Sequence, residues 1–487
     1  MRFKLTKTQA LCLRTLLNQC SSAFIVGGAV RDKILGKEPK DIDFATREYP
    51  NTVSRVLREE RLTIIPDQRA MSHGTVRVVD QDTGDLIDFT TLRQDIKCNG
   101  RHAQVRFTTN ILTDLERRDF TINAMACQVT LVGSDSCETD DIIDPYAAKI
   151  ILESDTKRIQ FVGNAYERIE EDALRMIRAC RFTALGDDFS IEPLSLLAIQ
   201  DRAYLVKNVS KERVRDEIMK ALKYPKPSAF FKALLETGLL QQIMPDMVFS
   251  VGCTQNIHHA EEVWEHLMMS LDAAVELTPN PLLRLAVVTH DIAKPHTKQM
   301  IKGDATFYKH DVVGEQIMRR WMREYKFSND EVNYVCKLVR HHLFRFEDNS
   351  TDKAIRHWLQ EVGRDTWRDL MTLRCCDRKG NLAKAGLPMI TSKMRELMEK
   401  VENMITTKVP LFKEDLVING NDLKDAGIPP GRIYKNIFSQ IMGIVIKDPE
   451  RNNREWLMDY VNRVYVAKEN NNVEQEKEDS ANTQEDK

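Results

Sequence analysis

Two carboxylates close to a glycine pair are the residues of this chain best placed to do chemistry. A short apolar run opens onto Gly27 and Gly28, and Asp41 and Asp43 follow on either side of Ile42. In an extended strand both carboxylates point to one side, where they repel each other unless a cation lies between them. Mg²⁺ favours carboxylate and phosphate oxygens, and glycines let a phosphate approach backbone N–H groups. The spacing predicts a phosphate cradle beside a two-carboxylate magnesium site, the equipment of nucleotidyl transfer.

A second group of charges lies within residues 171–182. Asp172 and Arg175 are three residues apart, and Arg178 and Arg181 continue at the same interval. If this stretch is helical, the four side chains share one face. Such a stripe is either a solvated ladder of ion pairs or a surface that recognises a ligand, and the spacing alone leaves both interpretations open.

Histidines and aspartates form a third set, far downstream. His290 and Asp291 are adjacent at the end of an apolar run. Single histidines on apolar helices are more often core residues than ligands, but imidazole next to carboxylate suits a divalent transition metal, which can make a nucleophile from water. The other members of the set are His266, His310, His341, His342 and Asp377.

The first group, in this order and spacing, resembles the nucleotidyltransferases of the DNA polymerase beta-like superfamily. More narrowly it is similar to the class II tRNA nucleotidyltransferase and bacterial poly(A) polymerase family. The resemblance implies that Asp41 and Asp43 are catalytic and hold Mg²⁺. It places Asp88 on a strand where the superfamily sometimes has a third carboxylate, and a catalytic and a structural role for Asp88 stay equally open. The nucleotide-binding positions that it implies in the head are Gly27, Gly28, Arg31 and Arg118.

The stretch 171–182 resembles the base-reading helix of the same family. The resemblance implies that Asp172 and Arg175 face the incoming base and that Arg178 and Arg181 belong to the same nucleotide-binding surface. A carboxylate accepts from the exocyclic amine that cytosine and adenine share, and an arginine donates to their ring acceptors. Protein side chains could thereby select C and A without a nucleic-acid template.

The downstream order of histidines and aspartates resembles the HD superfamily of metal phosphohydrolases. The resemblance places His266, His290, Asp291 and Asp377 at the metal positions. Some bacterial members of the class II family carry such a domain after the neck, and all four positions are filled here, which favours a working site. Histidine ligands favour Ni²⁺, Co²⁺ or Mn²⁺ over Mg²⁺.

The fold class that follows is α+β. We expect a polymerase beta-like head of mixed sheet and helices at 1–142, in which 133–141 forms a polar loop, and then an all-α neck, body and tail. The boundaries are a helical neck at 143–245, an HD domain at 246–390, a helical tRNA-binding tail at 391–466 and a disordered acidic tail at 467–487.

Composition sets the remaining expectations. The 487 residues carry a formal charge of −2, and residues 468–487 contribute −4 of it through seven acidic side chains and three lysines, so the rest is +2. Ten scattered cysteines indicate neither a zinc ribbon nor a disulfide framework. No apolar run has transmembrane length. We expect a reduced, cytoplasmic protein without a membrane partner, and the sequence gives no oligomeric state.

The leading functional hypothesis is addition of C, C and A to the 3′ end of tRNA from CTP and ATP, with a second HD phosphohydrolase activity. A bacterial poly(A) polymerase shares the first two motifs, and an enzyme that adds only CC or only A fits them as well. An alternative of another class is a phosphohydrolase whose head binds nucleotide as a regulator. The intact Asp41 and Asp43 argue against that alternative, because a regulatory pocket needs no paired metal carboxylates.

Overall fold

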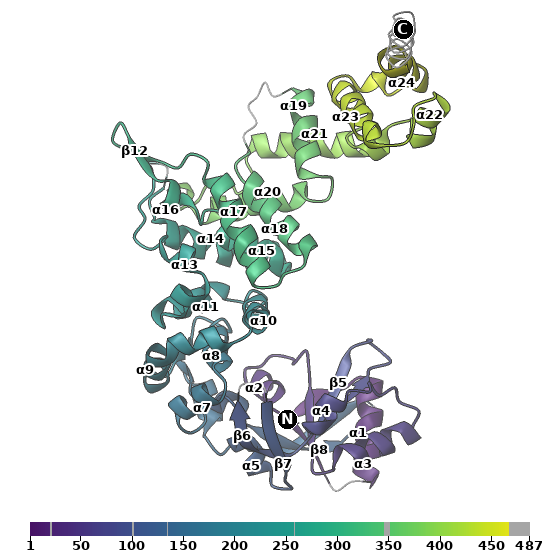
Figure 1. Cartoon of the computed structure of the whole chain (residues 1–487). Coiled ribbons are helices and arrows are strands. Elements are labelled where there is room, and N and C mark those ends of the chain that lie inside the picture. The colour runs from purple at the N-terminus through teal and green to yellow at the C-terminus, as the bar shows by residue number, and fades with distance from the viewer. Residues whose placement is uncertain (20–21, 100–101, 134, 258, 345–350, 467–487) are drawn as a thin grey trace, which may run out of the picture.

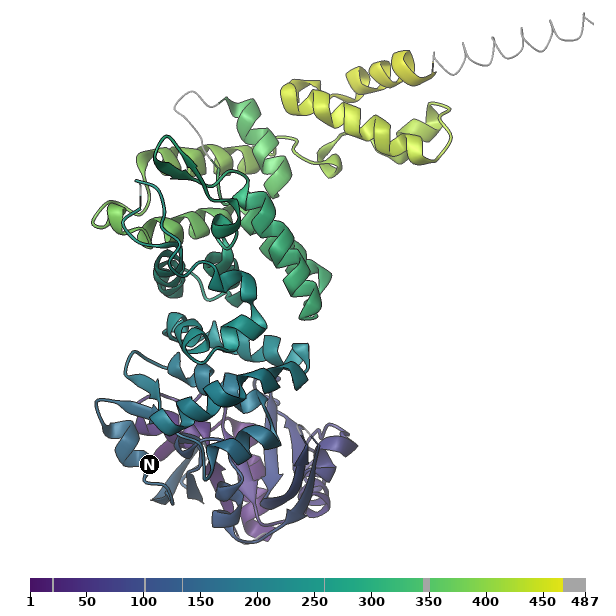
Figure 2. The same ribbon diagram turned by 60° about the vertical axis from the view of Figure 1, so that its left-hand side comes forward.

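The computed structural model describes residues 1–19, 22–99, 102–133, 135–257, 259–344 and 351–466. These residues form an elongated molecule with the N-terminal head at one end and the last helices at the other (Figures 1 and 2). The acidic segment 467–487, predicted to be disordered, lies outside the described residues. In the part of the chain that is described, no helix is both long and apolar enough to cross a membrane.

A seven-stranded mixed sheet forms the centre of the head, in the order β1-β9-β8-β2-β3-β5-β4. The β3–β5 pair is parallel, and the other neighbours within this sheet are antiparallel. β6 and β7 form a separate antiparallel hairpin. The strands are β1 (Arg2–Lys4), β2 (Ala23–Val26), β3 (Asp43–Thr46), β4 (Thr75–Val79), β5 (Leu86–Thr91), β6 (Arg93–Asn99), β7 (His102–Phe107), β8 (Ala126–Leu131) and β9 (Ser136–Ile143).

The two faces of this sheet carry different residues. One face packs on α1 and α3, and there Phe44 stacks on Phe89 with 5.1 Å between ring centroids. Successive side chains of a strand point to opposite faces, so Asp43 and Asp88 share the other face. The head helices are α1 (Lys7–Gln19), α2 (Gly28–Ile34), α3 (Pro50–Glu59), α4 (Gln68–Ser72) and α5 (Ile111–Glu116).

The prediction of a polar loop at 133–141 is wrong for most of that segment, because Ser136–Ile143 is strand β9. This strand pairs with β1 on one side and β8 on the other. The burial of Cys137 and the backbone pairing on both edges outweigh the polar composition. Strand propensity depends on such partners, which a single segment does not reveal.

The neck is helical apart from a short parallel strand pair, β10 with β11. Apolar residues at helical spacing, such as Leu174, Ile177 and Cys180, are buried where α8 packs on α10 and α11. The elements are α6 (Ala148–Glu153), β10 (Lys157–Ile159), α7 (Ala165–Glu171), α8 (Leu174–Thr183), β11 (Phe189–Ile191), α9 (Pro193–Arg202), α10 (Lys211–Ala221), α11 (Pro227–Glu236), α12 (Leu239–Ile243) and α13 (Pro245–Val248).

The next domain is a helical bundle in which α14 packs on α15 and α20, and α18 packs on α15 and α17. A hairpin of β12 and β13 interrupts the helices. The elements are α14 (Val263–Leu277), α15 (Pro281–Thr289), α16 (Lys294–Thr297), β12 (Gln299–Ile301), β13 (Asp304–Thr306), α17 (His310–Glu324), α18 (Asn329–His341), α19 (Asp352–Val362) and α20 (Trp367–Lys379).

The last helices have a hydrophobic core of their own. One continuous core joins residues of the head, neck and HD bundle and extends to Leu411, including Leu397 and Val401 of α21. A separate core starts at Leu416 and ends at Val461. The helices of this region are α21 (Ser392–Thr406), α22 (Gly420–Asp425), α23 (Arg432–Lys447) and α24 (Arg454–Val461).

Candidate active sites

The glycine turn of the head joins β2 to α2, as the sequence predicts. Gly27 has φ +70°, which glycine adopts without strain, and its N–H donates to Met125 O at 3.0 Å. A Cβ at this position would lie 2.8 Å from a terminal nitrogen of Arg118. The missing side chain therefore lets the Arg118 guanidinium lie directly against the turn.

Asp41 and Asp43 are both exposed, and Ile42 between them is buried. Strand β3 starts at Asp43, so Asp41 lies in the bend just before the strand, but the alternation still places both carboxylates on the outer side. The enclosing protein, together with the negative charges of Asp88 and Asp41, raises the pKa of Asp43, while the positive charge of Arg118 opposes that shift. A carboxylate crowded in this way gains from a divalent cation, and oxygen donors of this kind fit Mg²⁺.

Asp88 lies on β5, and its carboxylate accepts from Arg77 Nε at 3.3 Å. Arg77 is its register partner on β4 and also lies 3.4 Å from Asp67. Asp88 thus faces the same side as Asp43 but already has a counter-ion in Arg77.

Two more arginines predicted to meet the nucleotide are held by side chains of the head. Arg31 is buried and donates to Asn123 at 2.7 Å and to Asp32 at 2.8 Å. Arg118 is an ion-pair partner of the buried Asp114 at 3.2 Å. Both guanidiniums are therefore fixed close to the glycine turn before any ligand arrives.

The expectation that Asp172 shares a helix face with Arg175, Arg178 and Arg181 is wrong. Helix α7 ends at Glu171 and α8 begins at Leu174, and Asp172 between them is extended, with φ −155°. Its Oδ1 accepts from the Leu174 N–H at 3.2 Å. A short acidic side chain that bonds the following backbone competes with continuation of the helix.

Asp172 forms its ion pair with a residue 41 positions away. Arg213 of α10 donates to both carboxylate oxygens, at 2.6 and 3.1 Å, in a bidentate pair. Arg175 instead pairs with Glu171 at 2.5 Å and donates to Arg168 O at 2.9 Å. Asp172 and Arg175 are thus oriented by separate partners and not by each other.

Arg178 connects the neck to the head, whereas the partners of Arg181 lie within the neck. Arg178 binds Asp119 of the head at 2.5 Å, and although burial favours the neutral acid, this guanidinium lowers the pKa of Asp119. Arg181 is buried against Glu217 at 2.6 Å and donates to Tyr224 at 2.6 Å. Arg181 therefore lies on the core side of α8.

The downstream site gathers its four predicted ligands from three helices. His266 of α14, His290 and Asp291 after α15, and Asp377 of α20 are all buried. His266 Nε2 lies 3.3 Å from His290 Nε2 and 3.2 Å from Asp377 Oδ1, and Asp291 Oδ2 lies 3.2 Å from His290 Nε2. Two imidazoles with carboxylates close to them form a donor set that suits a divalent transition metal.

The histidines and aspartates of this site shift one another's pKa values. Burial opposes a charged imidazole, but Asp377 and Glu261 raise the pKa of His266 to about 9. Burial also opposes ionisation of Asp291 and Asp377, but the histidines hold the pKa of both carboxyls well below the ordinary value. The two aspartates are therefore held as carboxylates next to the imidazoles.

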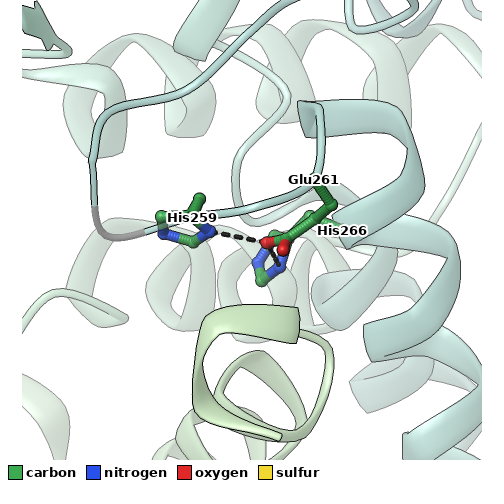
Figure 3. Close-up of side chains that lie close together, drawn as sticks. All are labelled: His259, Glu261 and His266. Atoms are coloured by element: carbon green, nitrogen blue, oxygen red, sulfur yellow. Dashed lines mark hydrogen bonds and ion pairs between the residues drawn. The ribbon is translucent and has the colours of Figure 1, made fainter.

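Glu261 orients the first of these histidines (Figure 3). Its carboxylate lies 2.7 Å from His259 Nδ1 and 3.4 Å from His266 Nδ1, and it accepts from the Leu382 N–H at 2.9 Å. Burial raises the pKa of Glu261, but the hydrogen bonds with His266 and His259 lower it to about 2. A carboxylate behind a ligating histidine fixes the ring and increases its basicity.

Three of the four predicted ligands, His290, Asp291 and Asp377, line a cleft of about 780 Å³. Cationic side chains contribute much of its wall, and Tyr308, which is 68% exposed, lies at its rim. The basic lining consists of Lys294, Lys309, Arg374 and Lys384. This charge favours an anionic ligand next to the metal site.

Three residues important to these sites were not among the predicted site residues. Arg213 and Glu217 are four apart on α10, so their shared helix face was the available sequence signal. Glu261 precedes α14 in a short polar stretch and offered no such signal. Arg213 and Glu217 act on residues of α8 and its start that only the fold brings near, whereas Glu261 acts on two histidines that are close to it in sequence.

Comparison with known proteins covers the head, neck and bundle. Residues 23–156 match the family "Poly A polymerase head domain", residues 188–249 match "Probable RNA and SrmB- binding site of polymerase A", and residues 263–378 match "HD domain". The head and the bundle together define a nucleotidyltransferase with an appended HD domain.

Proteins similar in sequence over most of this chain identify the family more narrowly. A CCA-adding enzyme of Levilactobacillus brevis is 30% identical over 428 residues, which span 86% of this chain and 88% of that protein. A CCA-adding enzyme of Streptococcus thermophilus is 27% identical over 90% of this chain and 92% of its own length. The chain belongs to the CCA-adding enzyme family.

Solved structures agree on the fold. The CCA-adding enzyme of Bacillus stearothermophilus, solved with CTP, has a TM-score of 0.62 at 24% identity and aligns over 95% of this chain and 98% of its own. A CCA-adding enzyme solved with ATP has a TM-score of 0.53 at 17% identity, over 93% of this chain and 94% of its own. The α+β head with a mostly helical remainder is thereby confirmed.

Proposed function

We propose that this protein adds C, C and A to the 3′ end of tRNA, using CTP and ATP and no nucleic-acid template. The observation that carries the proposal is the convergence of Asp43, Arg118 and the Gly27 turn on one side of the head. Asp172 and Arg175 follow in the adjoining neck, each already oriented by a partner of its own.

The chemistry assigns a part to each group. The tRNA 3′ hydroxyl attacks the α-phosphate in line, and pyrophosphate leaves. Asp41 and Asp43 would hold Mg²⁺, which supplies charge neutralisation for attacking and leaving oxygens when bound. Arg118 offers positive charge beside the glycine turn, where the triphosphate approaches. Asp172 accepts from the base amine, and Arg175 donates to the ring acceptors that cytosine and adenine share.

One assay tests this proposal and separates it from the alternatives. Three tRNA transcripts, ending before the CCA, after CC and after CCA, are incubated with CTP, ATP or both, and products are resolved at single-nucleotide length. Extension of the first transcript by C, C and A and then arrest supports the proposal. Repeated addition of A to any RNA would show a poly(A) polymerase. Extension only to CC, or only from CC, would show a partial enzyme.

A second candidate activity is favoured by the complete ligand set of the HD cleft. We propose that His266, His290, Asp291 and Asp377 hold Ni²⁺, Co²⁺ or Mn²⁺ and that the cleft hydrolyses small or cyclic phosphoesters such as damaged RNA ends carry. A cation there supplies Lewis acidity toward a phosphate oxygen. The basic wall of the cleft supports an anionic substrate.

The remaining proposals concern context. We propose the cytoplasm as the compartment, since tRNA and nucleoside triphosphates are the proposed substrates. Eight cysteines of the described residues are free thiols, which suits a reducing compartment. The divisions at 142, 245 and 390 and the tRNA-binding role of 391–466 are also proposals. Crosslinking of tRNA to the chain with and without residues 416–466, which have a separate core, would test the last of them.

A further inference from the structure

Asn123 lies behind the glycine turn of the head and contacts two arginines there. It ends a short 3₁₀ turn, Thr121–Asn123, and is buried. Its Oδ1 accepts from Arg31 at 2.7 Å, and its backbone carbonyl accepts from Arg118 at 3.4 Å. The same carbonyl oxygen would lie 3.6 Å from a Cβ at Gly27. One buried residue therefore contacts both arginines of the head that are predicted to bind the nucleotide.

The Asn123 side chain also contacts an acid that binds the neck. Its Nδ2 donates to Asp119 Oδ1 at 3.4 Å, and Asp119 Oδ2 accepts from Arg178 Nε at 2.7 Å. Arg178 is on α8, three residues after Arg175, so these two arginines lie on one face of that helix. A chain of three contacts thus runs from Arg31 in the head to the helix that carries Arg175.

The direction of this amide is fixed by its neighbours. A guanidinium can only donate, so the oxygen of Asn123 must face Arg31. The Asp119 carboxylate, which accepts from Arg178 and from the Phe120 N–H, can only accept, so the amide nitrogen must face it. An amide meets both demands at once, because it carries an acceptor and a donor on the same carbon.

A second contact between head and neck lies beside this chain. Phe182 of α8 is buried, and its ring centroid is 5.3 Å from the guanidinium carbon of Arg31 and 5.8 Å from that of Arg178. A guanidinium is attracted to the face of a ring, whereas a hydrogen bond also fixes the direction of its donor. Two routes therefore connect the arginines, and the route through the amide is the one that fixes their orientation.

We infer that Asn123 is a positioning residue for nucleotide addition, because it holds Arg31 of the head in register with the neck helix that carries Arg175. The inference rests on the CCA addition proposed above and deepens it. A nucleotide that bridges the two domains has to meet Arg31 with its phosphates and Arg175 with its base at the same time. A fixed spacing between these groups lets both contacts form without a further loss of conformational freedom.

Nucleotide binding without turnover gives the first readout. Dissociation constants of CTP and ATP are measured by titration calorimetry with Mg²⁺ and without tRNA, so that no addition occurs. Asn123→Ala should weaken both nucleotides by about tenfold, because Arg31 loses its hydrogen bond to the amide and both nucleotides share the triphosphate. Asn51→Ala is the matched control and should change neither constant, since Asn51 is an exposed residue of α3. Thermal melting of each variant reports whether it folds.

A double-mutant cycle then measures the connection itself. Arg31→Lys and Arg178→Lys keep the charge and lose the planar fork of donors. CTP dissociation constants are determined for the parent chain, each single variant and the double variant. The effect of Arg31→Lys should change by at least about threefold when Arg178 is also replaced, because the two side chains share one chain of contacts. In the Asn123→Ala background the two effects should simply multiply, since the connecting amide is gone.

The outcomes separate this inference from the function on which it rests. Effects that multiply in the parent chain would overturn the role of Asn123, whichever way the Asn123→Ala variant folds. Coupling that persists in the Asn123→Ala background would assign the connection to Phe182 and would overturn that role as well. No CTP binding by the parent chain would refute the proposed function together with the inference, whereas CTP binding with multiplying effects would refute the inference alone.

Discussion

At the scale of single residues, the head presents its charged groups already fixed by partners. Arg118 lies against the Gly27 turn because glycine leaves the room, and Arg31 is held by Asn123 at 2.7 Å. Groups fixed in this way need little reorganisation when charge develops at a reacting phosphate, and such preorganisation is a large part of catalysis.

Replacement of Asp41 or Asp43 by alanine should lower nucleotide addition by about 10²–10³-fold, because charge stabilisation at the reacting phosphate is lost. Folding should be unaffected, since both side chains are exposed. Rates of CMP addition measured against the parent chain, with tRNA binding measured separately, check this expectation. Near-normal rates in both variants would contradict the assignment of the metal to these residues.

Asp172 and Arg175, proposed to read the base, give a second expectation. Asp172→Ala and Arg175→Ala should each weaken the preference for C and A over G and U more than they slow addition. Arg213→Ala should act in the same direction as Asp172→Ala, by about tenfold in discrimination, because a bidentate charged pair orients that carboxylate.

Incorporation of all four nucleoside triphosphates provides the measurement. Arg215→Ala is the matched control, since Arg215 lies on the same helix but pairs with Asp216. Unchanged discrimination in the Asp172 and Arg175 variants would mean that other groups read the base.

At the scale of elements, helix α8 joins the head to the neck through Arg178 and Asp119. The pKa of Asp119 is lowered in the folded protein, so this group contributes stability above its unfolded pKa of about 4 and loses it as pH falls through the lower folded value. Asp119→Asn should therefore reduce stability at neutral pH by about 1.5–3 kcal/mol and flatten the acid limb of the stability curve.

Denaturant unfolding between pH 7 and pH 3 measures this effect. Asp216→Asn, whose carboxylate is exposed and pairs with the adjacent Arg215, serves as the control and should alter neither quantity. Equal acid sensitivity of the Asp119→Asn variant and the parent would contradict the expectation.

Close packing of two helices at Gly380 provides another test. A Cβ at Gly380 would overlap the Ser270 hydroxyl and lie 2.7 Å from the Ser270 backbone nitrogen, where α20 meets α14. Gly380→Ala should cost about 1–3 kcal/mol by overpacking, and it should also disturb the carbonyl that His266 contacts. Gly443→Ala in α23, with open space around it, should be neutral or slightly stabilising. Equal melting temperatures of the two variants would contradict this account.

The local sequence pattern was sufficient to predict features that depend on neighbouring residues. The glycine turn and the helical burial of Leu174 and Ile177 follow from spacing. The resemblance to HD proteins selected His266, His290, Asp291 and Asp377, which lie close together in the structure. The local pattern was insufficient where contact with a residue distant in sequence determines the local backbone structure. Strand β9 depends on pairing with β1, and the extended backbone at Asp172 accompanies a contact with Arg213.

At the scale of the whole molecule, the two candidate sites lie in different domains. His290→Ala combined with Asp291→Ala should abolish hydrolysis of a 2′,3′-cyclic nucleotide and leave CCA addition nearly unchanged, since distant changes act independently. Both activities are measured on the same preparation, with Mg²⁺ for addition and Ni²⁺, Co²⁺ or Mn²⁺ for hydrolysis. A parallel fall in both activities would contradict independence, and no hydrolysis by the parent chain would make the HD residues structural.

The separate core of the last helices should let them unfold independently of the rest of the chain. Residues from Leu416 to Val461 bury their apolar side chains among themselves, whereas head, neck and HD bundle share one continuous core. Residues that share a hydrophobic core unfold together. On heating, residues 416–461 should therefore unfold as one unit and the preceding part of the chain as another. A single melting temperature would then average two transitions, and a calorimetric trace should resolve a small peak with its own enthalpy beside a large one.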